Sequence, residues 1–459
     1  MDRRTWTMLA VALAAVLAAC DAPRPTEANA IAPSASRLST DDDADTLART
    51  VRMLAAARGI VPLPPPPFIR PSLVRLGQAL AFDRILSGPR DISCMTCHAV
   101  AYETGDARSL SIGTGGTGLG PTRSHPQGMF IPRNAPPLFN LFAMKHLFWD
   151  GRVEVDAHGQ LSTPAGAQLT PAMRRVLEFG PASALALFPV TNRSEMRGDA
   201  GNELAAIPDT DYTAIWKGIM ARLGRIPAYR AMFEAAYPGT RFDQMNFAYA
   251  SNAIGAFMVN QLTFENSPWD RFLAGRDDAL TPQQLVGAQT FLTLKCSLCH
   301  NGATLSDDQF HDVAVAQIGP GEGDGADGHD DFGRFRVTGN PDDLYRFRTT
   351  PLRNVELTAP YGHDGAIVDL RDFVAHYSQS DQKLLAYDPS QLEPLLQHTL
   401  VPNASAVIAR RDTLIVGVVL TDDLVNKLMD YMSALTDPSA RDLSRLAPRS
   451  VPSGLPVDR

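Results

Sequence analysis

Apolar residues recur at helical spacing along most of the chain after residue 70. After Pro71 and Ser72, the apolar positions Leu73, Leu76, Leu80 and Ala81 are three or four residues apart or adjacent, which predicts a helix capped by Ser72. The same spacing predicts helical stretches over 171–187, 212–236 and 242–262, a helix that begins at Thr281-Pro282, and a last one capped by Thr421. Few windows alternate with a period of two, so we expect a mainly α protein.

One short pattern occurs twice and predicts the chemistry. It reads Cys94-Met-Thr-Cys97-His98 in the first copy and Cys296-Ser-Leu-Cys299-His300 in the second. In C-x-x-C-H, two thiols one helical turn apart add to the vinyl groups of a haem, and the adjacent histidine binds the iron. A bare C-x-x-C would also suit half a zinc site or a redox disulfide. The histidine in both copies, and the lack of any further C-x-x-C, favour two covalent c-type haems.

Two motifs far apart in 459 residues predict two haem domains in tandem, both of the cytochrome c-like class. A faint repeat agrees, because a glycine-containing helix precedes each motif, and an Arg-Asn pair and then an Asp-Gly pair follow each one. Chance dipeptides would explain the pairs equally well. The expected organisation is a signal peptide at 1–19, a flexible tether at 20–67, haem domains at 68–275 and 276–440, and a flexible tail at 441–459.

The N-terminal segment resembles an export signal. Arg3 and Arg4 precede an apolar run that is too short for a permanent membrane helix, and the run ends in Leu17-Ala-Ala-Cys20. This ending resembles a bacterial lipoprotein signal, so we expect cleavage before Cys20 and a lipid anchor on its sulfur; an ordinary secretory signal is the alternative. Either signal predicts export to the periplasmic side of the cell envelope.

Charge and cysteine content exclude other classes. The net charge of −8 and the lack of a basic strip argue against a nucleic-acid partner. Of five cysteines, four belong to the motifs and the fifth is Cys20, so none is left for a disulfide. The Gly- and Asp-rich stretch 319–331 does not match an EF-hand, and we expect a solvated loop there.

The placed motifs resemble the bacterial dihaem cytochrome c peroxidase family, which includes the MauG-type enzymes. The resemblance extends from about Leu73 to Leu435. It rests on the following segments: Leu86-Ser-Gly88, Ser93 to His98, Ser111-Ile-Gly113, Pro132-Arg-Asn-Ala-Pro136, Phe148-Trp-Asp-Gly-Arg152, Pro189-Val190 with Glu195-Met196, and Phe347 to Asp364.

The resemblance implies roles for several residues. It makes the N-terminal haem the peroxide-reacting one, with Glu195 as the carboxylate that moves a proton between the peroxide oxygens, and it places Trp149 between the haems as an aid to electron transfer. A surface glutamate and a buried core aromatic are the ordinary alternatives. It also implies a calcium site made by Asn134 with the carbonyls of Thr358 and Pro360, unless Asn134 only caps a turn.

Two positions depart from the ordinary peroxidases. At the sixth-ligand position of the C-terminal haem stands Tyr377, as in MauG-type members, with His376 as the alternative because helix neighbours point about 100° apart. Where ordinary members have a removable distal histidine at the first haem, this chain has Thr114, which predicts an open iron. His125 is a possible substitute on a loop, where a histidine is more often solvated.

The resemblance implies a lipid-anchored periplasmic peroxidase. It would reduce hydrogen peroxide with electrons from a small c-type cytochrome or a cupredoxin, and a homodimer is a further expectation. A MauG-like enzyme, which uses peroxide to oxidise residues of a partner protein, is one alternative. A non-catalytic dihaem electron-transfer cytochrome, with both irons closed by two protein ligands, is the other.

Overall fold

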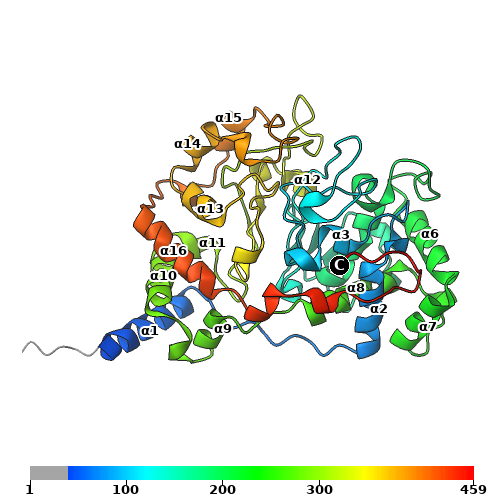
Figure 1. Ribbon diagram of the computed structural model, residues 1–459, viewed down its shortest axis with the longest axis horizontal. Helices are drawn as coiled ribbons and strands as arrows, with labels where there is room; N and C mark the ends of the chain where they lie inside the picture. The colour runs from blue at the N-terminus through cyan, green and yellow to red at the C-terminus, as the bar shows by residue number, and fades with distance from the viewer. Residues whose placement is uncertain (1–39) are drawn as a thin grey trace, which may run out of the picture.

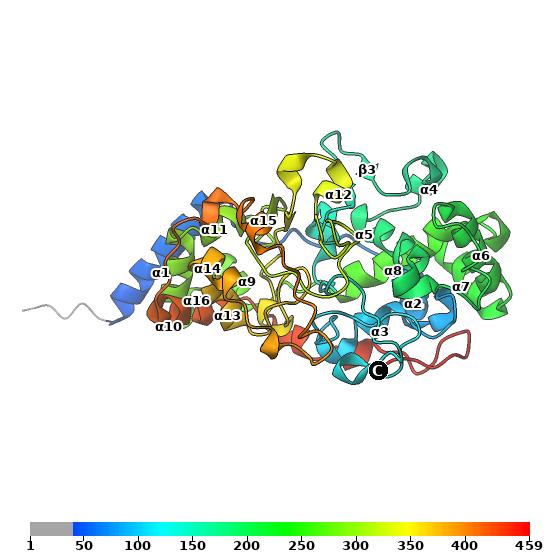
Figure 2. The ribbon, with the colours of Figure 1, turned by 90° about the horizontal axis from the view of Figure 1, so that it is seen from above.

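The computed structural model describes residues 40–459, and the signal peptide and Cys20 lie outside this range. Figures 1 and 2 show two mainly helical lobes side by side. Each lobe is organised around one C-x-x-C-H motif, α3 (Cys94–Cys97) in the first and α11 (Cys296–Cys299) in the second. The expectation of a mainly α protein with two haem domains is confirmed. Among the described residues no helix has the length and apolarity needed to cross a bilayer.

The first lobe is built on a crossing of two helices, α2 (Pro71–Phe82) and α8 (Phe247–Gln261). They touch backbone to backbone at Gly77, where a Cβ atom would lie 1.7 Å from the carbonyl oxygen of Ala253. Leu73, Leu76 and Leu80 are buried in the contact, and each such burial stabilises the fold by about 1.5–3 kcal/mol. The other helices of this lobe are α4 (Pro171–Arg174), α5 (Pro181–Ala184), α6 (Tyr212–Gly224) and α7 (Pro227–Ala236).

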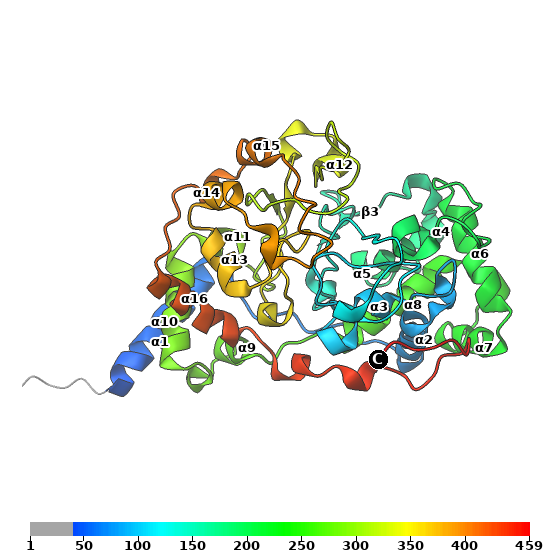
Figure 3. The same cartoon turned by 45° about the horizontal axis from the view of Figure 1, so that its top comes forward.

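The second lobe repeats this crossing with α10 (Pro282–Thr293) and α16 (Asp422–Ala434). Here the close approach is at Gly287, where a Cβ atom would lie 2.1 Å from the carbonyl oxygen of Lys427. The caps predicted for these two helices are confirmed, because Thr281 accepts from the Gln284 N–H and Thr421 from the Leu424 N–H. Figure 3 shows this group of helices at the opposite end of the molecule from α7. The remaining helices are α1 (Thr40–Ala57), α9 (Pro268–Leu273), α12 (Phe335–Thr338), α13 (Leu370–His376), α14 (Ser380–Leu385) and α15 (Ala404–Ile408).

Strands are few and short. The stretch after Arg152 contributes to an antiparallel sheet of β1 (His146–Leu147), β2 (Val153–Val155) and β3 (Leu161–Ser162). A second pair, β4 (Phe310–His311) and β5 (Phe347–Arg348), lies in the second lobe. The stretch 212–236 forms two helices instead of one, because Pro227 cannot continue α6 and begins α7. Likewise α2 begins at Pro71, and its N-cap is Arg70 and not Ser72.

Both ends of the described chain cross to the other lobe. The segment predicted as a tether contains α1, whose Ala48, Val51 and Ala55 are buried in the core of the second lobe. The segment 441–459 is not a flexible tail, because Leu443, Leu446 and neighbouring apolar residues are buried in the first lobe. The apolar residues of α1 and of segment 441–459 pack against core residues that are distant in sequence, so these contacts exist only in the folded chain.

Candidate active site

The first motif is held as a single helical turn. Ser93 caps α3 in a capping box with Thr96, and the N–H of His98 donates to the carbonyl of Cys94 at 3.0 Å. Both cysteines are half-buried on this turn, one turn apart, and His98 follows directly at its C-terminal end. The arrangement brings two thiols and an imidazole to one place, which is what covalent haem attachment requires.

The two motif histidines are oriented in the same way. The Nδ1 atom of His98 lies 3.0 Å from the carbonyl oxygen of Thr104, and that of His300 lies 3.1 Å from the carbonyl oxygen of Leu305. A carbonyl can only accept, so Nδ1 carries the proton and the Nε2 lone pair is left for a metal. Burial lowers the pKa of both histidines, which favours the neutral form that binds iron.

The four motif thiols also fit the haem. None of them is in a disulfide in the part of the chain that the structure describes. Burial raises the pKa of Cys94 to about 12 and that of Cys296 to about 11, so these groups stay uncharged. A thioether, the product of addition to a vinyl group, is also uncharged and apolar. The donor set at both motifs therefore fits a covalently attached c-type haem.

Glu195 lies in a π-helical turn, Arg193–Arg197, next to the first motif. The Asn192 side chain accepts from the N–H groups of Ser194 and Glu195 at 2.9 and 3.2 Å, which holds the start of this turn. Burial raises the pKa of the Glu195 carboxyl, while the nearby Arg152 guanidinium acts in the opposite direction. Its charge in turn contributes to the raised pKa of Cys94, so the carboxyl lies near the motif.

Thr114 and His125 lie on the loop beside this turn. The Thr114 N–H donates to the carbonyl of Glu195 at 3.0 Å, and its hydroxyl lies 3.1 Å from both carboxylate oxygens of Asp91. His125 is half-buried and packs on the backbone of Gly115, where a Cβ atom would lie 2.6 Å from its Nε2. Its Nδ1 accepts from the Gln127 N–H at 3.1 Å.

Trp149 lies in the seam between the lobes. It is buried, its Nε1–H donates to the carbonyl of Asn134 at 2.9 Å, and its own carbonyl accepts from the Arg348 N–H at 2.9 Å. The Arg348 guanidinium is buried as well and forms no ion pair with the described residues; burial lowers its pKa to about 10. Such a cation needs a counter-charge, and a haem propionate is a group of the right charge. The sequence alone did not single out Arg348, although it lies in the matched segment.

A buried ion-pair network crosses the same seam. Arg133 bonds both oxygens of Asp331 at 2.6 and 2.8 Å and Asp150 at 2.6 Å, and Glu322 lies 3.4 Å away. Arg152 joins through Asp150 at 3.0 Å. These arginines lower the pKa of Asp150. The stretch 319–331 is therefore not simply a solvated loop, because it supplies Asp331 and Glu322 to this network.

Asn134 and Thr358 line one small cavity together, with Ala359 and Asp106 among the other lining residues. The Asn134 amide nitrogen donates to the carbonyls of Arg108 and Ser109 at 3.0 and 3.2 Å, which leaves its oxygen for another partner. The Oδ2 atom of Asp106 is buried and has no hydrogen-bond partner among residues 40–459, and burial raises the pKa of this carboxyl to about 6. A lone aspartate carries no sequence signal, so no motif indicates Asp106.

At the second motif the two neighbouring candidates differ in surroundings. His376 is buried and its Nε2 lies 2.8 Å from the carbonyl oxygen of Val313, and burial lowers its pKa to about 4. Tyr377 lies near Cys296 and Cys299, and burial raises the pKa of its phenol. Of the two side chains, the tyrosine lies near the motif cysteines and the histidine bonds to the backbone.

The fold and the two sites define a dihaem c-type cytochrome. A family model described as di-haem cytochrome c peroxidase matches residues 71–278. The cytochrome c551 peroxidase of Pseudomonas aeruginosa is 33% identical over 310 residues, which cover 65% of this chain and 70% of that protein. The chain belongs to the dihaem cytochrome c peroxidase and MauG family and is a peroxidase-type oxidoreductase.

The chain is also similar to MauG proteins. The methylamine utilization protein MauG of Paracoccus denitrificans is 28% identical over 397 residues, covering 80% of this chain and 89% of that protein. Among solved structures, a MauG-like protein associated with microbial copper homeostasis is similar with a TM-score of 0.58 at 25% identity, covering 84% of this chain and 96% of that one. Peroxidases and MauG proteins are thus both similar to the chain.

Proposed function

We propose that this protein reduces hydrogen peroxide at its N-terminal haem with electrons that enter at its C-terminal haem. The observation that carries the proposal is the difference between the motifs. A half-buried carboxyl, Glu195, lies near the first motif, whereas a tyrosine, Tyr377, lies near the second. The overall change is H₂O₂ + 2e⁻ + 2H⁺ → 2H₂O. It requires a group that transfers protons at the N-terminal haem, where peroxide reacts, and only electron transfer at the C-terminal haem.

The residues divide this work. The haems supply the iron redox chemistry when they are bound through Cys94, Cys97 and His98 and through the second motif. Glu195 takes a proton from one peroxide oxygen and returns it to the other, a task that suits a carboxyl whose pKa is raised toward neutrality. Trp149, bonded to both lobes, gives the electrons a fixed aromatic path across the seam.

The donor and the location are further parts of the proposal. A small c-type cytochrome or a cupredoxin delivers the electrons, and the protein is anchored by a lipid on Cys20 at the periplasmic side of the envelope. The short apolar run that ends at Cys20 supports the anchor. Labelling of cells with a radioactive fatty acid tests it, and a chain with Cys20→Ala should lose the label.

We also propose that calcium binds between the lobes through Asn134 and the carbonyls of Thr358 and Pro360. A free amide oxygen, backbone carbonyls and the unpartnered carboxylate of Asp106 around one cavity are the oxygen ligands that suit this hard cation. Calorimetric titration of the chelator-treated protein tests the site. Asp106→Asn should weaken the binding if the carboxylate contributes.

A second candidate function is MauG-like oxidation of residues in a partner protein. Thr114, in place of a removable histidine, and Tyr377, as the proposed sixth ligand, favour it. Steady turnover of peroxide with reduced cytochrome c decides between the two, since a MauG-like enzyme would show little. If neither peroxide nor cyanide changed either Soret band, the protein would be a non-catalytic electron carrier.

A further inference from the structure

The last residues of the chain form a strap over the first lobe. This C-terminal strap, residues 436–459, leaves α16 in the second lobe and ends beside α3 (Figures 1 and 2). Its buried residues Ala440, Leu443, Leu446 and Val451 belong to the core of the first lobe. The strap therefore has a defined path with its own apolar anchors.

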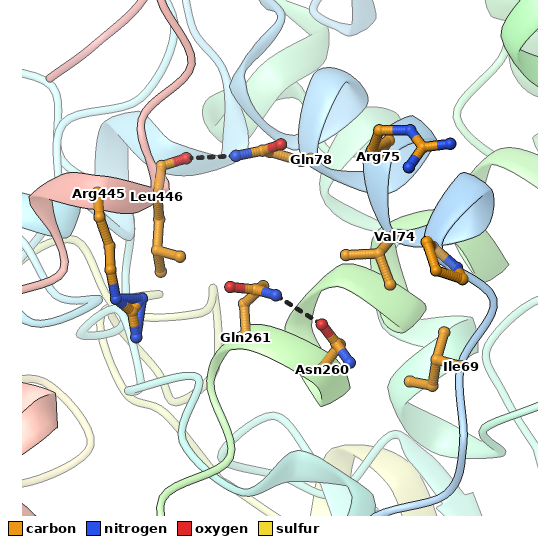
Figure 4. A pocket seen from close by; sticks show the side chains of 9 residues that line it. Ile69, Val74, Arg75, Gln78, Asn260, Gln261, Arg445 and Leu446 are labelled. Carbon is orange, nitrogen blue, oxygen red and sulfur yellow. Dashed lines mark hydrogen bonds between the residues drawn. The ribbon is translucent and has the colours of Figure 1, made fainter.

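Hydrogen bonds fix the strap at points before its end. The carbonyl of Leu446 accepts from the Gln78 amide at 2.9 Å, at the edge of an open pocket between α2, the end of α8 and the strap (Figure 4). Further along, the Ser453 hydroxyl donates to the buried carboxylate of Asp83 at 2.6 Å. These contacts hold the strap against α2, the helix that leads to the first motif.

The penultimate residue makes the contact that concerns the haem. The Asp458 side chain is 7% exposed. One oxygen accepts from the Thr96 hydroxyl at 2.5 Å and lies 3.4 Å from the Ser93 hydroxyl, and the other accepts from Arg84 at 2.5 Å. A carboxylate is costly to bury, and here each oxygen has a donor to offset that cost.

Thr96 and Ser93 are the capping box of the haem-binding turn. The Thr96 hydroxyl accepts from the Ser93 N–H at 2.9 Å and has a single proton, which it donates to Asp458. Asp458 thus fixes the direction of this hydroxyl and, through it, the start of α3. His98 ends the same turn, so its place depends on where the turn lies.

The second lobe has no equivalent among the described residues. The N-cap of α11 is Lys295, without a side-chain capping bond, and the Ser297 hydroxyl bonds to the carbonyl of Leu292 in the preceding helix. An external carboxylate holds the capping box of the first haem-binding turn. At the start of the second turn no carboxylate does so among the described residues, and the Lys295 ammonium donates instead to the carbonyl of Val416 at 2.8 Å.

We propose that Asp458 is a positioning residue for the first haem, which clamps the Cys94–Cys97 turn and thereby sets the orientation of His98 toward the iron. The inference rests on the proposed function only in taking His98 as the iron ligand. It concerns the orientation of His98 and not the reaction of peroxide, so its test is independent of the role of Glu195.

The test compares Asp458→Ala with Asp442→Ala in the full-length holoprotein. Asp442 is an exposed aspartate of the same strap that only caps a local turn through the Ser444 N–H at 2.9 Å. Haem content per chain, the ferric EPR spectrum and the iron–histidine band in the resonance Raman spectrum are measured for both. We expect two haems in each, a shifted signal of the first haem alone in Asp458→Ala, and the unchanged spectrum in Asp442→Ala.

A second pair of variants separates positioning from stability. Thr96→Val removes the hydroxyl and should shift the same signal, the double variant with Asp458→Ala should shift it no further, and Thr96→Ser should restore the original spectrum. Asp458→Asn, which keeps the size of the side chain, replaces Asp458→Ala if that variant does not fold. Unchanged signals of the first haem, or equal changes at both haems, would overturn the proposal even if the melting temperature fell.

Discussion

The two lobes share the same haem-attachment turn and helix crossing, but different side chains lie near the turn in each lobe. In both, a glycine lets the helix before the motif cross a later helix at backbone contact, and a backbone carbonyl orients the motif histidine. The first lobe then presents Glu195 and the second presents Tyr377. The haem-attachment turn is thus common to both lobes, and the residues near it differ between them.

The largest effect is expected at the seam that joins the lobes. Arg133→Leu leaves Asp331 buried without its cation and leaves Asp150 with Arg152 alone, and removal of one partner from such a network costs about 3–5 kcal/mol. We expect urea unfolding at a lower midpoint, with both haems still attached. Arg241→Leu is the control, because its pair with Asp243 is exposed and should matter little. Equal stability of the two variants would mean that the lobes do not depend on this network.

Glu195→Gln tests the chemical side of the comparison. The amide cannot take a proton from one peroxide oxygen and return it to the other, so turnover should fall by about 10²-fold or more, equivalent to about 2.7 kcal/mol. Both haems should remain bound, and the spectrum of the second should not change. Stopped-flow mixing with peroxide measures the rate, with the exposed Glu265→Gln as control. Normal rates in Glu195→Gln would remove this residue from the mechanism.

The likeness of the lobes can be tested at the two helix crossings. Gly77→Ala and Gly287→Ala each place a methyl group within about 2 Å of a carbonyl oxygen of the partner helix, at 1.7 and 2.1 Å before relaxation. Overpacking of this kind costs about 1–3 kcal/mol. We expect both variants to have a lower melting temperature than the parent. Gly275→Ala is the control for backbone strain alone, because no atom lies within 4 Å of the added Cβ there while φ is positive. A melting temperature like that of the parent in one variant would show that the crossings are not equivalent.

Much of this arrangement was predictable from the sequence, because its signals are local. The motif spacing predicted both attachment turns, and Thr281 and Thr421 predicted two helix starts correctly. Most of the misses depend on contacts between distant segments, whereas the break between α6 and α7 at Pro227 is a local signal. Asp458 reaches Thr96 across 362 positions and Asp331 reaches Arg133 across 198, and no local period encodes either pairing. The burial of α1 and of the strap likewise depends on surfaces that form only when both lobes have folded.

The smallest expected effect is confined to the second lobe. Tyr377→Phe removes one hydroxyl next to Cys296 and Cys299 and keeps the ring, so packing should hardly change. If the phenol oxygen is the sixth ligand, the ferric spectrum of the second haem alone should change, and its reduction potential should rise because an anionic ligand is lost. His376→Gln is the matched control, as its ring bonds to the Val313 carbonyl and should leave that spectrum in place. If His376→Gln changes the spectrum and Tyr377→Phe does not, the neighbouring histidine is the ligand, and the second site differs from the first in geometry more than in ligand chemistry.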